Sequence, residues 1–532
     1  MTRTSAGALR RLAGSPRSQG VTGAQDAPLS LATSAPYEPV DEFPQGVASG
    51  LPTPTSIVLW TLARRPGPVR WELASDPSFT SRTLVATGEV EAVAGRARAV
   101  HVAVDKLRPA SYYWYRFHSR GVTSPIGRTR TAPHPSILPP RLKFGFASCQ
   151  MYSDGHFGSL RALAEDPDVD FVVHLGDYVY DCLSRTPPRP SRPDPIVQAT
   201  TLADYRAKYA LTHSDLNLQA MRAAHPLLAV WDDGEVGDPD EWGGAFPDPK
   251  RKAAGFRAWW EHMPTLPFEH EAHRVYRSLR WGRLAELFLL DERQYRHPRP
   301  PGGFSFAARA MHEPGLTLLG EQQRRWLLDG LAASDTTWRV LGNPLMMAPL
   351  RIPLDPGPRL RSIVAPFLDR VNLRHFAPVG AGFYLNTLQW DGYQDERREL
   401  LEFIESNSIR NVVALSGDIH AWFTAELSPD VDDRRRRPVL AEFTGSSVST
   451  ANWAEVTGLS TRPLFDVLRR LEPWLIYAES ESHGHGLVEI TPDDCRVTYV
   501  TAETLDTPWS AVRPLARFRV DSGSSKIHRE RT

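Results

Sequence analysis

The chain has 532 residues, a mass of 59.5 kDa and a mean hydropathy of −0.36, with 41% hydrophobic and 23% charged residues. This composition excludes a disordered chain and a bundle of membrane-spanning helices, and at roughly 150 residues per domain the length predicts about two to four domains. The 62 basic residues balance the 62 acidic ones, so the chain lacks the overall positive charge of a general nucleic-acid-binding protein.

The first 36 residues predict a disordered arm, because they are rich in Gly, Ser, Ala and Arg and have no apolar period. Arg10 and Arg11 are adjacent, as in an export signal, but residues 13–20 bring Gly, Ser and Pro where such a signal needs an apolar stretch. We therefore predict a cytoplasmic protein, with export left open. No apolar run in the sequence approaches the roughly 18 residues of a membrane span.

Residues 37–135 have short runs of β-branched and aromatic residues between Gly and Pro turns. The clearest runs are Ser56–Trp60, Val69–Leu73 and Tyr112–Phe117. Strands at this spacing predict an all-β sandwich of the immunoglobulin or fibronectin type III kind. The Pro-rich stretch Pro133–Pro140 then predicts a stiff linker to the next domain.

Residues 136–520 predict a catalytic α/β domain, because apolar runs there end abruptly in Gly, Asp or another polar residue. The predicted strands are Leu142–Ala147, Phe171–Leu175, Leu227–Trp231, Leu287–Leu290 and Val412–Leu415. Amphipathic helices are predicted at Leu319–Ser334 and Asp395–Ser406. The Pro-rich and Arg-rich segments Leu183–Ile196 and Met347–Tyr384 predict long loops over the site, and the polar residues 521–532 predict a flexible tail.

The segment His174–Tyr180 places Asp177 three residues before Tyr180, just past a buried strand. One carboxylate and one phenol can then face the same ion at the strand end, and phenolate is a hard anionic ligand that suits trivalent iron. The alternative is that Asp177 caps a turn beside a packed tyrosine.

Two further strand ends carry the same kind of side chain. In Ser416–His420, Asp418 and His420 alternate after a buried strand, and Trp231–Asp238 crowds several carboxylates at the end of another. Those carboxylates belong to Asp232, Asp233, Glu235 and Asp238. So many negative charges repel one another unless cations lie among them, so the three segments together predict a multi-metal site.

These segments resemble the PhoD-type alkaline phosphatases, the alkaline phosphatase D branch of the calcineurin-like metallophosphoesterases. The resemblance follows the family's order along most of the chain, through Phe43–Gly50, Phe144–Gln150, Gly176–Tyr180, Leu290–Arg296, Gly320–Gln323, Trp338–Asn343, Ser416–His420 and His483–Gly484. It implies an α/β catalytic domain with a metallophosphoesterase-type β-sandwich core flanked by helices, behind an N-terminal all-β domain. It also implies hydrolysis of phosphate monoesters, diesters or both, of small molecules or polymers, by a hydroxide that bridges metal ions.

The metals that this resemblance implies are Fe3+ and one or two divalent ions, expected to be Ca2+. The implied iron ligands are Cys149, Tyr180 and His420, with Asp177 as the bridge to the second metal. Asp418 and Asp238 would hold the divalent side. This division agrees with the preference of soft donors for transition metals and of carboxylates for calcium. Without its neighbours, Cys149 would be interpreted as a buried inert thiol.

The resemblance also assigns catalytic roles to Arg293, Asp233 and His483. The Arg293 guanidinium could bind phosphate oxygens in a bidentate manner. The alternative for Arg293 is a structural salt bridge with Asp291 or Glu292, and for His483 a structural histidine with satisfied hydrogen bonds.

One departure from the family concerns its usual Trp-Asp-Asp-His-Glu motif, because Gly234 stands in place of the His and Asp238 in place of a following Asn. Loss of the His removes a side chain that could assist the leaving group, so Gly234→His is expected to raise turnover of alkyl esters. The alternative expectation is that an imidazole there crowds the carboxylates and slows every ester.

Two other functions remain as alternatives. One is a degenerate family member that binds metal or phosphate without efficient turnover. The other is a different hydrolase with a carbohydrate-binding or adhesion module, although the sequence has no GxSxG, HExxH or P-loop motif. No specific nucleic-acid recognition is expected, and the sequence leaves the oligomeric state open.

Overall fold

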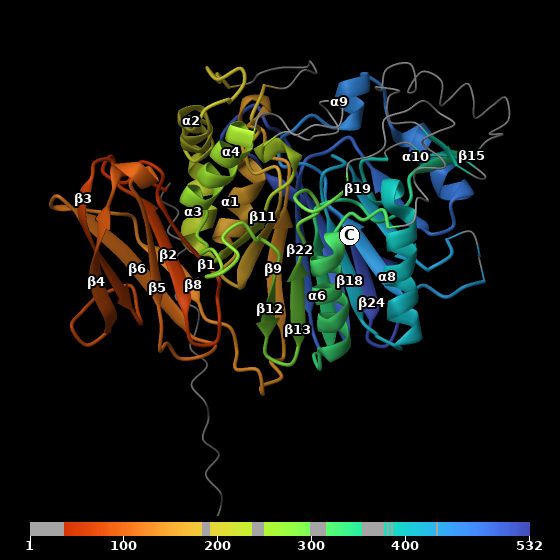
Figure 1. Ribbon diagram of the computed structural model, residues 1–532, viewed down its shortest axis with the longest axis horizontal. Helices are drawn as coiled ribbons and strands as arrows, with labels where there is room; N and C mark the ends of the chain where they lie inside the picture. The colour runs from red at the N-terminus through yellow and green to blue at the C-terminus, as the bar shows by residue number, and fades with distance from the viewer. Residues whose placement is uncertain are drawn as a thin grey trace, which may run out of the picture.

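The computed structural model describes residues 37–183, 192–236, 249–297, 315–353, 377–379, 382–384, 387–431, 433 and 435–531. Figure 1 shows an all-β N-terminal domain, coloured red to orange, beside a larger α/β domain that holds the rest of the chain. Four helices, α1 to α4, lie on the side of the large domain that faces the N-terminal domain. The N-terminal strands therefore pack against helices of the large domain.

The N-terminal domain contains two sheets that share one apolar core. The first sheet has the order β1-β2-β5, and the second runs β4-β3-β6-β7 with β8 also paired to β6. Their strands are β1 (Val47–Gly50), β2 (Ile57–Leu62), β3 (Gly67–Ala74), β4 (Leu84–Ala92), β5 (Ala99–Val104), β6 (Tyr112–Ser119), β7 (Val122–Thr123) and β8 (Gly127–Arg130). Leu59 of the first sheet and Leu73 and Phe117 of the second are fully buried in the same cluster. The predicted β-sandwich is confirmed, and its immunoglobulin-like label stays a prediction.

The large domain is built on two seven-stranded sheets. The first has the order β11-β10-β9-β22-β23-β24-β25 and the second the order β12-β13-β14-β18-β20-β19-β21. Strands of the first sheet are β9 (Leu142–Ala147), β10 (Phe171–Leu175), β11 (Leu227–Val230), β22 (Gly484–Ile490), β23 (Asp494–Ala502), β24 (Val512–Asp521) and β25 (Ile527–Glu530). Strands of the second are β12 (Arg277–Trp281), β13 (Ala285–Leu289), β14 (Trp338–Asn343), β18 (Val412–Ser416), β19 (Trp422–Leu427), β20 (Leu440–Thr444) and β21 (Leu475–Glu479).

Helices cover the outer faces of the two sheets. They are α1 (Gly158–Glu165), α2 (Leu202–Thr212), α3 (Leu216–Ala224), α4 (Pro249–His262), α6 (Gly320–Ala333), α8 (Gln394–Ser406), α9 (Trp453–Thr457) and α10 (Arg462–Leu471). A small sheet adds β15 (Arg351–Pro353), β16 (Ala377–Val379) and β17 (Gly382–Tyr384). Leu327 and Leu331 recur four residues apart on α6, so one helix face is apolar and packs with Leu341 on the second sheet.

The main core lies between the two sheets. Phe144 and Val173 of the first sheet share one buried cluster with Val340, Val413 and Phe443 of the second. The described chain is therefore a mixed α/β fold of two packed sheets between helices, as the sequence predicts.

The parallel strands of both sheets end at the same edge of this sandwich. β9, β10 and β11 are parallel in the first sheet, and β13, β14, β18 and β20 are parallel in the second. The loops that follow β9 and β18 approach so closely that a Cβ on Gly417 would lie 2.6 Å from Ser148 Oγ. Only glycine fits there, and residues from both sheets can therefore meet in one site.

The polar tail is a correction to the sequence analysis. Residues 527–530 are not loose but form β25, which pairs antiparallel with β24. Ile527 is buried, and its backbone N–H donates to Glu426 Oε1 at 2.7 Å. Strand pairing with β24, together with the buried Ile527 and its bond to Glu426, therefore anchors a segment whose composition is otherwise polar.

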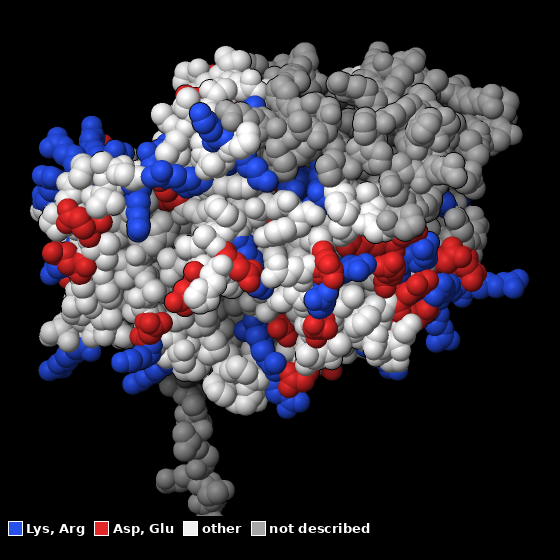
Figure 2. Space-filling view, in the orientation of Figure 1, with Lys and Arg blue, Asp and Glu red and all other residues white. Residues whose placement is uncertain are grey.

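Acidic and basic side chains are mixed on the face in Figure 2, above all over α6 and α8, where Arg324 pairs with Glu399 and Arg325 with Glu321. This mixture agrees with the zero net charge of the chain. Within the described residues, no helix has the length and apolar character needed to cross a membrane.

Candidate metal centre

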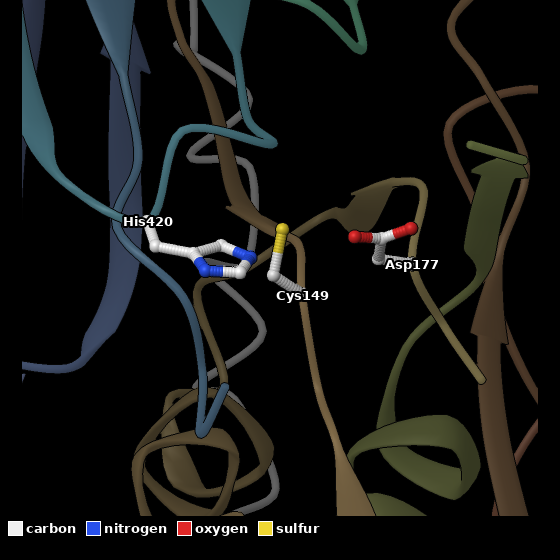
Figure 3. A group of neighbouring side chains, drawn as sticks. All are labelled: Cys149, Asp177 and His420. Atoms are coloured by element: carbon white, nitrogen blue, oxygen red, sulfur yellow. The ribbon is translucent and has the colours of Figure 1, made fainter. Parts of the chain in front are cut away.

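Three ligand-type side chains converge between the ends of β9, β10 and β18. The sulfur of Cys149, one carboxylate oxygen of Asp177 and one ring nitrogen of His420 all lie within 4.8 Å of one another. Figure 3 shows the Cys149 sulfur between the His420 ring and the Asp177 carboxylate. We call Cys149, Asp177 and His420 the thiol–imidazole group.

Tyr180 adds a phenol to this group. Its hydroxyl donates to Asp177 Oδ2 at 2.7 Å and lies 3.3 Å from His420 Nε2. Burial, followed by the charges of Asp177 and Cys149, raises the pKa of the Tyr180 phenol. Burial likewise raises the pKa of the Cys149 thiol, with Asp177 and Asp418 adding to the effect. Both groups therefore need a nearby cation to become anionic ligands.

The imidazole of His420 is neutral and oriented. Burial lowers its pKa to about 4. Nδ1 lies 3.0 Å from the Ala451 carbonyl oxygen, which can only accept, so Nδ1 carries the proton. Nε2 is then left with a lone pair that faces Tyr180 and Cys149, as a metal ligand requires.

Four residues of the site have backbone φ angles in the left-handed region. The angles are 58° for Cys149, 55° for Asp177, 64° for Asp418 and 52° for His420. Such angles are unfavourable for residues with a Cβ and cluster at functional sites. The surrounding fold therefore holds these side chains in place at a local energetic cost.

A second group consists of carboxylates alone. Carboxylate oxygens of Asp177, Asp232, Asp233 and Asp418 all lie within 4.8 Å of one another, and we call these residues the carboxylate group. Burial and the charge of Asp233 raise the pKa of Asp418 to about 7. Burial also raises the pKa of Asp177 well above its usual range, with Asp233 and Asp232 adding to the effect. Asp177 belongs to both groups and lies between them.

Glu235 clamps two of these loops without joining the carboxylate group. Its fully buried carboxylate accepts backbone N–H groups from Asp177 at 3.0 Å, Tyr178 at 2.8 Å and Asp232 at 2.9 Å. These three bonds tie the loop after β10 to the loop after β11, which indicates a structural role for Glu235.

Arg293, from the loop after β13, reaches into the carboxylate group. Its guanidinium donates to Asp232 and lies 3.2 Å from Asp418 Oδ1 and 3.7 Å from Asp233 Oδ1. The predicted alternative partners are engaged elsewhere: Asp291 accepts the backbone N–H groups of Arg293 and Gln294, and Glu292 accepts from Leu345 N and Trp390 Nε1. Within the described residues, the Arg293 guanidinium therefore pairs with carboxylates of this group rather than with Asp291 or Glu292.

One predicted site residue, His483, lies elsewhere. His483 contacts Ser447, Asn452 and Glu455 rather than the two groups above. Asp238 falls outside the described residues. The structure thus brings together Cys149, Asp177, Tyr180, Asp233, Arg293, Asp418 and His420.

The residues present fit metal ions. Four mutually close carboxylates, three of them with pKa values raised by burial and mutual repulsion, face one guanidinium among the described residues, that of Arg293. A divalent cation would relieve this repulsion. The convergent thiol, imidazole and phenol are donors that suit a transition metal.

Sequence reasoning gave no ligand role to Asp232 and overlooked Gln389. Asp232 was counted among the crowded carboxylates, but its place in the carboxylate group depends on the loop after β11. Gln389 donates from Nε2 to Asp418 and accepts from Met346 N at 2.6 Å. No motif marks Gln389, because it lies in a turn before α8 and is far along the sequence from the strand ends that it contacts.

The chain is similar to known phosphatases in both sequence and structure. The family model of the PhoD-like phosphatases matches residues 144–499, and the model of their N-terminal domain matches residues 30–133. The chain is 31% identical to alkaline phosphatase D of Bacillus subtilis (strain 168) over 94% of its own length and 84% of that protein. A solved structure of PhoD superposes with a TM-score of 0.78 at 29% identity, covering 93% of both chains.

The fold and these matches define a hydrolase of phosphoric esters. More particularly, the chain belongs to the PhoD-like phosphatase family.

Proposed function

We propose that this protein hydrolyses phosphate monoesters, diesters or both at a centre that holds iron(III) and one or two divalent ions, the latter calcium. The observation that carries the proposal is the position of Asp177, whose carboxylate belongs to both the thiol–imidazole group and the carboxylate group. A carboxylate shared in this way suits a bridge between two metals.

The two groups differ in donor chemistry, and this difference supports the assignment of the ions. Cys149, His420 and Tyr180 would hold iron, since thiolate, imidazole and phenolate favour a transition metal. Asp418, Asp232 and, from outside the described residues, Asp238 would hold the divalent side, since hard oxygen donors favour calcium.

When bound, the metal ions supply a nucleophile by lowering the pKa of water and stabilise negative charge on phosphate. Arg293 would bind and orient the phosphate, because its guanidinium lies 3.2 Å from Asp418 and 3.7 Å from Asp233. Asp233 is a partly exposed member of the carboxylate group, so its carboxylate could accept a hydrogen bond from the substrate.

Metal analysis and the visible spectrum of the purified protein test the assignment. We expect bound iron and a coloured protein, because phenolate and thiolate bound to iron(III) give charge-transfer absorption. Tyr180→Phe should shift or bleach that band. A calcium chelator should abolish activity and leave the colour in place, because the carboxylate side is the more exchangeable one. A colourless, iron-free and fully active protein would contradict the proposal.

Arg293→Ala is expected to weaken the binding of inorganic phosphate by about 100-fold and to raise KM by a similar factor, since a bidentate charge-assisted contact is lost. Arg293→Lys should recover part of this affinity. Arg296→Ala is the matched control, because Arg296 is buried to a similar degree in the same loop and donates to the Leu388 carbonyl. Equal phosphate affinity in wild type and Arg293→Ala would remove Arg293 from the substrate site.

A further inference from the structure

The loop between β20 and α9 runs across the thiol–imidazole group. We call its residues Ser447–Asn452 the strap. Val448 N donates to Ser148 O at 3.0 Å, and the backbone N–H groups of Ser449 and Thr450 donate to Cys149 O at 3.3 and 3.2 Å. Backbone hydrogen bonds therefore attach the strap to the loop that carries Cys149.

The single hydroxyl of Thr450 contacts three residues at or beside the thiol–imidazole group. Its Oγ1 lies 2.8 Å from Cys149 O, accepts from Met151 N at 3.2 Å and lies 3.0 Å from Tyr180 Oη. The next residue, Ala451, accepts from His420 Nδ1 through its carbonyl at 3.0 Å. Two consecutive strap residues thus contact side chains or backbone that come from the ends of three different strands.

His483 fixes the strap from its other side. Ser447 Oγ donates to Thr450 O within the strap, so it can accept from His483 Nδ1, which lies 2.9 Å away. Asn452 Oδ1 accepts from Glu455 N, and Asn452 Nδ2 lies 3.0 Å from His483 Nε2. Gly484 N donates to Ser447 O at 3.0 Å. Both ring nitrogens of His483 therefore contact the two ends of the strap.

We propose that the strap positions the ligands of the thiol–imidazole group, with Thr450 and His483 as its positioning residues. The inference rests on the proposed function, because it concerns residues assigned there to iron. Cys149 and His420 have left-handed backbone angles of 58° and 52°, so they need outside contacts to stay in place. Partners of metal ligands commonly set ligand orientation, and their loss typically costs 10 to 100-fold in metal affinity.

Thr450→Val tests the first half of the proposal, because valine keeps the shape and loses the hydroxyl. We expect iron transfer to a strong iron chelator to become about tenfold faster and the charge-transfer band to shift, since the contact between Thr450 Oγ1 and Tyr180 Oη at 3.0 Å is lost. Thr450→Ser should restore both values. Thr444→Val is the matched control, because Thr444 is fully buried six residues upstream and its hydroxyl has no hydrogen-bond partner among the described residues.

His483→Leu tests the second half, with His485→Leu as control. His485 is also buried and lies two residues along the chain, and its Nδ1 has no hydrogen-bond partner in the part of the chain that the structure describes. We expect His483→Leu to accelerate iron loss and broaden the band, although the contacts of the His483 ring with described side chains are to Ser447, Asn452 and Glu455 and not to Cys149, Tyr180 or His420. A fall in turnover with unchanged band and iron retention would instead make His483 a catalytic group and overturn its positioning role.

The outcomes separate this inference from the function on which it rests. A wild-type protein without iron or colour would contradict the iron assignment itself. A coloured wild type with Thr450→Val and His483→Leu variants of unchanged band and iron loss would overturn only the role of the strap. If Thr450→Val does not fold, as judged by circular dichroism, Thr450→Ala replaces it. The comparison of His483→Leu with its control His485→Leu then tests the strap independently.

Discussion

Asp177→Asn is expected to lower phosphoester hydrolysis by at least about a thousandfold, which is roughly 4 kcal/mol of activation barrier. Asp177 is the residue that the thiol–imidazole and carboxylate groups share, so its loss weakens both metal sites at once. The asparagine amide keeps the size of the side chain and cannot supply a bridging negative charge. The purified variant should contain less iron and less of the divalent ion than the wild type.

The same substitution should stabilise the metal-free protein. Burial and neighbouring carboxylates raise the pKa of Asp177 in the folded state, so the folded protein binds more protons than the unfolded chain above about pH 4. Stability therefore falls as pH rises from there, and asparagine removes this loss. We expect a higher Tm for metal-free Asp177→Asn than for metal-free wild type at pH 8, with the difference vanishing near pH 4.

Asp170→Asn is the matched control for this experiment. Asp170 is buried at the opposite end of β10 and pairs with Arg130. Its loss leaves a partly buried guanidinium without its carboxylate partner, so the metal-free Tm should fall at pH 8 while metal content is retained. Unchanged activity and metal content in Asp177→Asn would contradict the bridging role, and a lower metal-free Tm at pH 8 would contradict the predicted cost of burying the Asp177 charge.

Much of the site could be predicted because strand ends are visible in sequence. The apolar run Phe171–Leu175 becomes β10, and Asp177 follows it directly. The same holds for Cys149 after β9 and for Asp418 and His420 after β18. Since parallel strands end at one edge, residues far apart in sequence meet there without further information.

The parts that could not be predicted depend on contacts between loops. The clamp by Glu235 requires the loops after β10 and β11 to lie close together, so that one carboxylate can accept three of their backbone N–H groups. The strap has no charged or metal-ligating residue of its own, so Thr450 carries no signal in the sequence. The antiparallel strands of the first sheet, β22 to β25, were also not predicted, because they do not end in the Gly-Asp pattern that marked the other strands.

The structure changes the expectation for Gly234. Its backbone N–H donates to Asp177 Oδ1 at 2.8 Å, and a Cβ at this position would lie 2.5 Å from the same oxygen and 3.1 Å from Val179 O. Any side chain there must displace the Asp177 carboxylate that both groups share. The crowding alternative is therefore favoured over a gain in leaving-group assistance.

Gly234→Ala and Gly234→His separate the two effects, since alanine adds only the Cβ and histidine adds the imidazole as well. We expect Gly234→Ala to lower turnover of aryl and alkyl phosphate esters together, by about 10 to 100-fold, with weaker metal retention in proportion. Gly234→His should be at least as slow on both esters. Gly95→Ala is the control, because a Cβ at Gly95 meets nothing within 4 Å.

The comparison of the two variants decides between the accounts. If the imidazole protonates the leaving group, Gly234→His should exceed Gly234→Ala on alkyl esters alone, because an alkoxide needs a proton and a phenolate leaves without one. Full activity of Gly234→Ala on both esters would show that the Asp177 carboxylate tolerates a neighbouring Cβ, and the crowding account would then be wrong. A parallel loss on both esters in both variants, with metal lost as well, would show that glycine is required at position 234 so that Asp177 can reach both groups.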